Sequence, residues 1–147
     1  MEKAIKDCKA VINTLNVSRK TDNFWAPLRA PQDLISTSAA HAIQAMEKTG
    51  VKRFIALSTL GAGPSWKTIP WILKFLVSIS NLKYAFQDHS QQEELLINSA
   101  LDYTICRASM LTDKIHPEGA VATPEHTAPA SMNLSRSAAA EFFIRLI

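Results

Sequence analysis

The chain has 147 residues, a hydrophobic fraction of 47%, a charged fraction of 20% and a formal net charge of +3. These values are typical of a globular protein with a real core and argue against disorder. A net charge this small, without a long run of basic residues, argues against a nucleic-acid-binding protein, which needs a concentrated basic face.

The first predicted elements are a strand and a helix. Segment 10–15 is short, apolar and β-branched, and it ends where a polar stretch begins, which is typical of a buried strand. Segment 33–49 has apolar residues at helical spacing. We expect Asp33 to cap this helix at its start and Gly50 to take the left-handed position at its end.

The second predicted strand, 54–59, is apolar throughout, as expected of a strand covered on both faces. It ends at the turn signal 61–64 and is followed by an irregular insert. The most apolar part of that insert, 69–79, contains Pro70 and Lys74 and is about half as long as a membrane span requires. No signal stretch opens the chain. We therefore expect a soluble cytoplasmic protein with no membrane partner.

The remaining elements complete an alternating pattern. Segment 84–99 predicts a helix whose surest core residues are Leu95 and Leu96. Segment 103–106 predicts the third strand, and the tail 135–147 predicts a last helix. Helices that alternate with apolar strands predict an α/β fold with a parallel sheet and right-handed crossovers. Two cysteines, Cys8 and Cys106, are too few for a disulfide framework and are expected to be buried, reduced thiols.

Ligands of such folds bind at the carboxyl ends of the strands. Three segments follow predicted strands and should meet at one edge of the sheet: Thr14-Leu15-Asn16, Ser58-Thr59-Leu60-Gly61 and Arg107-Ala108-Ser109-Met110.

Four blocks stand in a recognisable order, AVINTLN, GVKRFIALSTLGAG, EELLINSALDYTICRASMLTD and LSRSAAAEFFIRLI. They resemble consecutive blocks of the atypical short-chain dehydrogenases, above all the NmrA-like NAD(P)-binding proteins and the B-type flavin/biliverdin reductases. The resemblance covers nearly the whole chain. It implies a Rossmann-type, doubly wound parallel sheet that binds NADP or NAD, with NADP favoured only on family grounds.

The sequence departs from that family in the segment that binds the pyrophosphate of the dinucleotide. The family's glycine-rich turn, which holds the pyrophosphate through backbone N–H groups, has no counterpart, and residues 1–9 leave no room for it. We therefore expect residues 1–147 to form the C-terminal half of a partial Rossmann domain that is incomplete at its N-terminus. The first strand would then leave a sheet edge exposed, through which the chain would form a homodimer or aggregate.

The Tyr–Lys pair of the classical dehydrogenases is also absent, because Asp88 stands four residues after Tyr84. The resemblance implies instead that the hydroxyls of Ser58 and Thr59 lie near the nicotinamide and the substrate carbonyl. The alternative is that they only hydrogen-bond the backbone at a strand end. His89 follows an aspartate as in the B-type reductases and is a candidate proton donor, or else a solvated histidine near a helix start.

The remaining candidate residues are expected to bind a ligand rather than to take part in the reaction. Arg107 would pair with a phosphate or carboxylate, or else with Asp102 or Asp113. The resemblance implies that the cofactor lies against the strand ends, at Thr14, Leu15, Asn16, Ser58, Arg107, Ala108, Ser109 and Met110. The other histidines are isolated and give no metal-ligand spacing: His41, His116 and His126.

An apolar stripe in the insert comprises Trp66, Trp71, Phe75 and Leu76. The resemblance implies a pocket or lid for a planar apolar substrate such as a flavin or a quinone. A core helix, or a patch that packs on another half-domain or subunit, remains an equal alternative.

The main hypothesis is an NAD(P)H-dependent oxidoreductase that transfers a hydride to a small planar or carbonyl substrate, the protein supplying orientation and a dry pocket. One alternative is a non-catalytic NAD(P)-binding sensor or assembly factor, favoured by the missing glycine turn and Tyr–Lys pair. The other is a truncated half-domain without activity.

Overall fold

The computed structural model describes residues 1–21, 23–114, 119–123 and 132–147. His116 and His126 lie outside the described residues. The sheet at the centre of the molecule has three strands in the order β1-β2-β3. The strands are β1 (Ala10–Asn13), β2 (Arg53–Thr59) and β3 (Asp102–Ala108).

All three strands run parallel, as the alternation of helices and strands predicts. Asn13 lies beside Ala56 in the β1–β2 ladder, and Thr59 lies beside Ala108 in the β2–β3 ladder. The carboxyl ends of the strands therefore meet at one edge of the sheet, and the expected α/β fold with a parallel sheet is confirmed.

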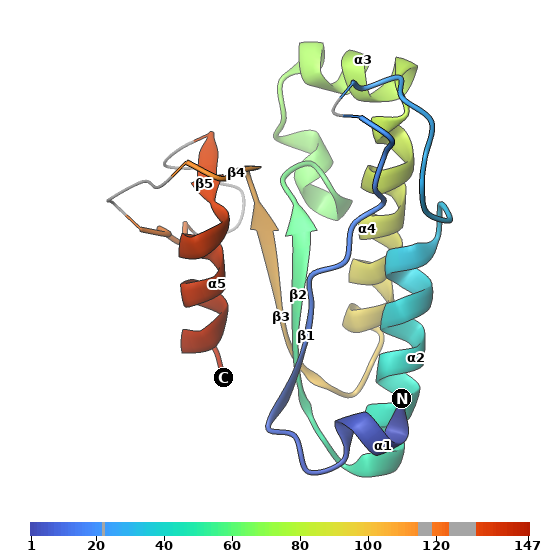
Figure 1. Ribbon diagram of the computed structural model, residues 1–147, viewed down its shortest axis with the longest axis vertical. Helices are drawn as coiled ribbons and strands as arrows, with labels where there is room; N and C mark the ends of the chain where they lie inside the picture. Colours follow the sequence, from blue (N-terminus) through green and yellow to red (C-terminus); the bar gives the residue numbers. More distant parts are fainter. Residues whose placement is uncertain (22, 115–118, 124–131) are drawn as a thin grey trace.

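Helices cover the two faces of the sheet differently (Figure 1). One face carries the long helices α2 (Leu34–Thr49) and α4 (Leu82–Ile97). The other carries α5 (Arg136–Arg145), beside a small parallel pair of strands, β4 (Met110–Thr112) and β5 (Asn133–Ser135). The short helix α1 (Glu2–Ile5) lies at the amino end of the sheet, and α3 (Trp71–Ile79) lies beyond its carboxyl end.

The main core lies between the sheet and the two long helices. Phe54 of β2, Met46 of α2 and Leu96 of α4 have no exposed surface and belong to one hydrophobic cluster. Burial of each such side chain contributes about 1.5–3 kcal/mol relative to its exposure to water. This cluster fixes α2 and α4 against the sheet and so determines which of their residues reach the strand ends.

The end of α2 follows the prediction, but its start does not. Gly50 has a φ of 79° and donates its N–H to the carbonyl of Met46, which closes the helix as expected. The side chain of Asp33 makes no capping hydrogen bond, so the prediction that it caps the helix was wrong. Another carboxylate takes that role, as described below.

Two further predictions were wrong in the second half of the chain. The insert after β2 is not irregular, because it forms a 3₁₀ helix at Gly63–Lys67 and then α3. Leu95 is 38% exposed, whereas Leu96 is fully buried, because Leu96 lies on the inward face of α4 and its neighbour points about 100° away from it around the helix.

Both cysteines are free thiols, but Cys8 is exposed rather than buried. Cys106 is half-buried, and this burial raises its pKa to about 11. A thiol with such a pKa is an inert thiol rather than a nucleophile. Within the described ranges, the helices are too short or too polar for any of them to cross a membrane.

Candidate functional site

The structure brings the three predicted strand-end segments to the same edge of the sheet. Leu60 donates its N–H to the carbonyl of Ala108 over 2.9 Å, so the segments after β2 and β3 are joined where they leave the sheet. Thr14 and Asn16, after β1, are exposed, and Thr59 is half-buried. This edge is the candidate site, and it is open to solvent both beside β1 and after β3, where Met110 is 65% exposed.

Behind this edge, the inward face of α4 is polar. Four consecutive inward positions of the helix hold buried side chains that can ionise or hydrogen-bond: Asp88, His89, Gln92 and Glu93. They have the spacing of one helical face and continue the line from Ala85 to Leu96. The spacing of these polar residues is visible in the sequence, but the inward face of a helix is ordinarily predicted from apolar residues, so this face was not predicted.

Asp88 caps α2 from the neighbouring helix. Its two carboxylate oxygens accept the backbone N–H groups of Ile35 at 2.7 Å and Ser36 at 2.9 Å. Free N–H groups at a helix start form a ready site for an anion such as phosphate. Here those groups already bind a carboxylate, so the start of α2 is closed to a second anion.

Gln92 joins α4 to the first two strands. Its Oε1 accepts a hydrogen bond from Asn13 Nδ2 at 2.7 Å, and its Nε2 donates to the carbonyl of Leu57 at 3.0 Å. Asn13 Oδ1 in turn accepts the N–H of Leu15 at 3.2 Å. The turn that leaves β1 is therefore positioned through a fully buried glutamine on α4.

Glu93 joins the ends of β2 and β3. Its Oε1 accepts the hydroxyl of Ser58 at 2.6 Å and Nε of Arg107 at 3.0 Å, and its Oε2 accepts Nη2 of Arg107 at 2.9 Å. Ser58 is 2% exposed, so its hydroxyl proton is directed at Glu93 rather than at the edge of the sheet. This carboxylate therefore holds the next-to-last side chain of both β2 and β3.

The expected internal partners of Arg107 were wrong. Asp102 pairs with Arg53, at 3.2 Å, and Asp113 pairs with Arg136. Arg107 instead forms a two-point pair with Glu93, because both side chains lie on the α4 side of the sheet.

The loop after β2 packs closely against α4. Gly63 has a positive φ, and a Cβ at this position would collide with the carboxylate of Glu93. Its N–H donates to Ser90 Oγ over 2.9 Å. This glycine therefore serves the packing of the loop on the polar face of α4 and not the approach of a phosphate.

His89 is buried in the middle of α4, with 3% of its surface exposed. The alternative of a solvated histidine near a helix start is therefore wrong. Its Nδ1 has no hydrogen-bond partner among the described residues. Burial lowers the pKa of His89 below its ordinary value, against the opposing charges of Asp88 and Glu93, so the imidazole is neutral at pH 7.

These residues fit one part of a dinucleotide better than the other. The hydroxyls and backbone groups at the strand ends, around Thr14, Thr59 and Ala108, suit a nicotinamide and its ribose. The N–H groups at the start of α2 offer the pyrophosphate no comparable cradle, because Asp88 already binds them. The strand ends thus fit the nicotinamide end of the cofactor, and the start of α2 does not fit its diphosphate.

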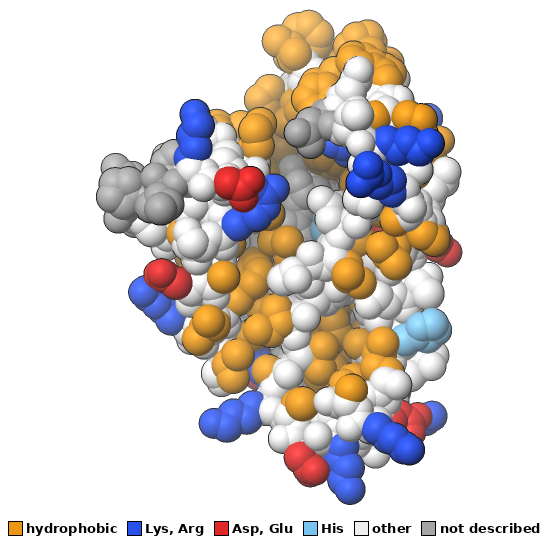
Figure 2. Space-filling model, viewed as in Figure 1, with side chains coloured by type: hydrophobic (Ala, Val, Ile, Leu, Met, Phe, Trp, Pro, Cys, Tyr) orange, Lys and Arg blue, Asp and Glu red, His pale blue; other side chains and the backbone are white. Residues whose placement is uncertain are grey.

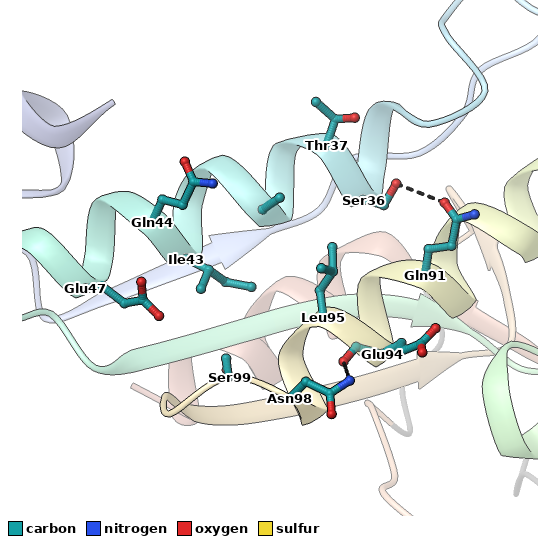
Figure 3. Close-up of a pocket in the computed structure, with 11 residues that line it drawn as sticks. Ser36, Thr37, Ile43, Gln44, Glu47, Gln91, Glu94, Leu95, Asn98 and Ser99 are labelled. Carbon is teal, nitrogen blue, oxygen red and sulfur yellow. Dashed lines mark hydrogen bonds between the residues drawn. The ribbon is translucent and has the colours of Figure 1, made fainter.

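A groove of about 690 Å³ lies elsewhere, between α2 and α4 on the outer side of the two helices (Figure 3). Ile43 and Leu95 lie within it, and Gln44, Glu47 and Asn98 surround them. The groove is separated from the strand ends by the helices themselves, so we do not assign it to the cofactor.

A comparison with models of protein families shows the family of the chain. The family model described as NAD(P)H-binding matches residues 1–147. No match was found among the curated proteins.

Solved structures share the fold. The anaerobilin reductase ChuY of Escherichia coli is 22% identical, with a TM-score of 0.73 over 99% of this chain and 60% of that one. A putative NAD-dependent epimerase/dehydratase of Bacillus halodurans is 23% identical, with a TM-score of 0.71 over 99% of this chain and 61% of that one. A short-chain dehydrogenase/reductase of Veillonella parvula, solved with NADP, is 20% identical, with a TM-score of 0.68 over 99% of this chain and 58% of that one. The chain thus spans about 60% of the length of the solved structures that it resembles.

Proposed function

Because the chain belongs to the NAD(P)H-binding family, we propose that it forms the nicotinamide-facing part of an NAD(P)H-dependent oxidoreductase of the atypical short-chain type. The observation that carries the proposal is the meeting of three parallel strand ends above a buried polar face of α4. The bound dinucleotide would supply the hydride, and the substrate would be small and either planar or a carbonyl compound.

In this proposal the strand ends share the work of binding. The loop of Thr14, Leu15 and Asn16 would contact the nicotinamide ribose from the β1 side, since it is exposed there. The segment from Ala108 through Ser109 to Met110 would border the cofactor from the β3 side. Both segments leave parallel neighbours of β2 and face the same edge of the sheet.

The candidate catalytic residues take different roles because their side chains lie at different depths. Strand alternation places Thr59 on the opposite face from Ser58, and its half-buried hydroxyl is proposed to hydrogen-bond the substrate oxygen. Ser58 and Arg107 would act as positioning residues, because Glu93 holds both. His89, neutral and buried, would donate a hydrogen bond from behind the loop rather than transfer a proton.

The test is binding and turnover by the purified chain. NADPH or NADH would be titrated while the dinucleotide fluorescence is followed, and its oxidation would be measured with FMN or menadione as acceptor. Thr59→Val removes one uncharged hydrogen bond, worth about 1 kcal/mol, so we expect kcat to fall on the order of fivefold with little change in cofactor affinity. Failure of the wild-type chain to bind either dinucleotide would overturn the proposal.

A second candidate is a non-catalytic NAD(P)-binding sensor or assembly factor. It is favoured by the Asp88 cap on α2, which leaves the diphosphate without the N–H groups of that helix. Binding of NADPH without its oxidation by any acceptor would support this candidate over the enzyme.

We also propose that the chain self-associates through β1. In the part of the chain that the structure describes, β1 is an edge strand, and Ile12 on it is 37% exposed. Exposed apolar edges recruit other chains, and a charge on such a strand prevents this. Light scattering should show a dimer that Ile12→Lys converts to a monomer; a wild-type monomer at high concentration would refute the pairing.

A further inference from the structure

An exposed apolar surface lies at the α3 end of the molecule. We call it the α3 patch, and it consists of Phe24, Trp25, Trp71, Ile72, Phe75 and Ile79. Four of these side chains are more than half exposed, one in the loop before α2 and three on α3: Trp25 at 55%, Trp71 at 75%, Ile72 at 62% and Phe75 at 61%. Figure 2 shows hydrophobic side chains gathered at this end of the molecule.

The patch is a single surface built from two segments. On α3, the exposed residues lie at the spacing of one helical face, whereas Val77 on the opposite side is buried. The loop before α2 is joined to the end of α3 by a hydrogen bond, because Trp25 Nε1 donates to the carbonyl of Ile79 at 3.2 Å. Asn81 also donates its N–H to the carbonyl of Phe24 at 2.9 Å. The patch is thus held in place by hydrogen bonds between the two segments.

The two segments that build the patch carry an excess of basic residues. The sequence contains no Asp or Glu from residue 48 to residue 87. The two segments that build the patch, 18–32 and 60–87, hold six Lys or Arg residues and a single acidic residue, Asp22. Lys74 lies on α3 itself, and its Nζ donates to the backbone carbonyl of Lys67 at 3.2 Å, which holds this charge beside the segment that leads into the helix.

We propose that the α3 patch binds the surface of a membrane that contains anionic lipids. Tryptophan and phenylalanine on one helical face, with lysines beside them, are the composition of a segment that lies in the headgroup region. The basic surround attracts anionic headgroups and falls off within a Debye length, so the binding depends on salt. The sequence-based expectation of no membrane partner rested on the length of 69–79, which bears on crossing a bilayer and not on lying at its surface.

The charge favours a lipid surface over a second copy of the chain. Two copies that met through the α3 patch would bring their basic residues together, and like charges oppose such a contact. An anionic lipid surface satisfies the apolar and the basic groups at once.

The test is sedimentation of the purified chain with vesicles. Vesicles of phosphatidylcholine with phosphatidylserine should bind the chain and shift its tryptophan emission to shorter wavelength, and vesicles of phosphatidylcholine alone should not. Trp71→Ser combined with Phe75→Ser should abolish the binding, whereas Ile144→Ser, which changes an equally exposed residue on α5, should not alter it. Lys74→Gln should weaken it on the order of fivefold, and high salt should release the chain.

Three results would overturn the proposal. One is the absence of binding to the anionic vesicles, and another is equal binding to both kinds of vesicle. The third is self-association that Trp71→Ser abolishes while vesicles capture nothing, which would assign the patch to a second copy of the chain. Circular dichroism of the variants keeps these outcomes apart from misfolding.

Discussion

Helices α3 and α4 follow each other in the chain and invert the usual relation between residue type and burial. The inward face of α4 holds Asp88, Gln92 and Glu93, each with at most 1% of its surface exposed. The outward face of α3 presents Trp71 and Phe75, which are 75% and 61% exposed. The polar groups are buried and the large apolar groups are not.

The difference shows that the available hydrogen-bond partners, and not the residue type alone, determine which side chains are buried in this molecule. Each buried oxygen or nitrogen discussed on α4, apart from His89 Nδ1, meets a group of opposite hydrogen-bonding character on a strand end or on α2. Burial of a polar group costs free energy only if its hydrogen bonds are not replaced. Measurements of the free energy of unfolding can therefore test whether the contacts of α4 stabilise the fold and whether the side chains of the α3 patch do not.

The largest effect is expected at Glu93. Glu93→Gln keeps an acceptor for Ser58 but removes the charge opposite Arg107, whose side chain is 17% exposed. Breaking a buried ion pair is costly because the remaining charge lacks its partner, so we expect a loss of about 3 kcal/mol in the free energy of unfolding. Urea denaturation would measure it. The exposed neighbour supplies the control, since Glu94→Gln should change stability by less than about 0.5 kcal/mol.

The next effect compares two candidate caps of α2. Asp88→Asn weakens two charge-assisted hydrogen bonds to the helix start, so we expect a loss of roughly 2 kcal/mol in the same measurement. Asp33→Asn, at the position that the sequence favours, should cost less than about 0.5 kcal/mol. Equal losses in the two variants would mean that the helix is capped locally and would contradict the role of Asp88.

A pH dependence is expected from His89. Burial lowers its pKa in the folded state, so the unfolded state binds a proton first as the pH falls. Its contribution to stability is complete above about pH 6.5 and is lost as the pH drops towards the folded-state pKa, with a slope of at most about 1.4 kcal/mol per pH unit. His89→Gln should remove this slope in denaturation series at several pH values, whereas His41→Gln on the exposed side of α2 should retain it.

The smallest effect is expected on the α3 patch. Trp71→Ser and Phe75→Ser remove side chains that face solvent, so each should change the free energy of unfolding by less than about 0.5 kcal/mol. Val77→Ala, on the buried side of the same helix, should cost more than about 1 kcal/mol. A large loss at Trp71 would show that the patch packs within the folded chain and would weaken its assignment as a binding surface.

The sequence by itself determined the layout of the sheet and which strand ends meet at one edge. Three apolar runs separated by helical segments allow few topologies, and parallel pairing brings the ends of β1, β2 and β3 to one edge. Gly50 could be assigned to the end of α2 because the left-handed conformation is a local property of the backbone.

Only the tertiary structure decided which groups are partners. Asp88 replaces Asp33 as the cap of α2, and Glu93 replaces Asp102 and Asp113 as the partner of Arg107. Asn13 and Gln92 lie 79 positions apart in the chain and still share a hydrogen bond. Such contacts depend on which faces of α2, α4 and the sheet meet, and that geometry comes from packing of the whole core rather than from any local pattern.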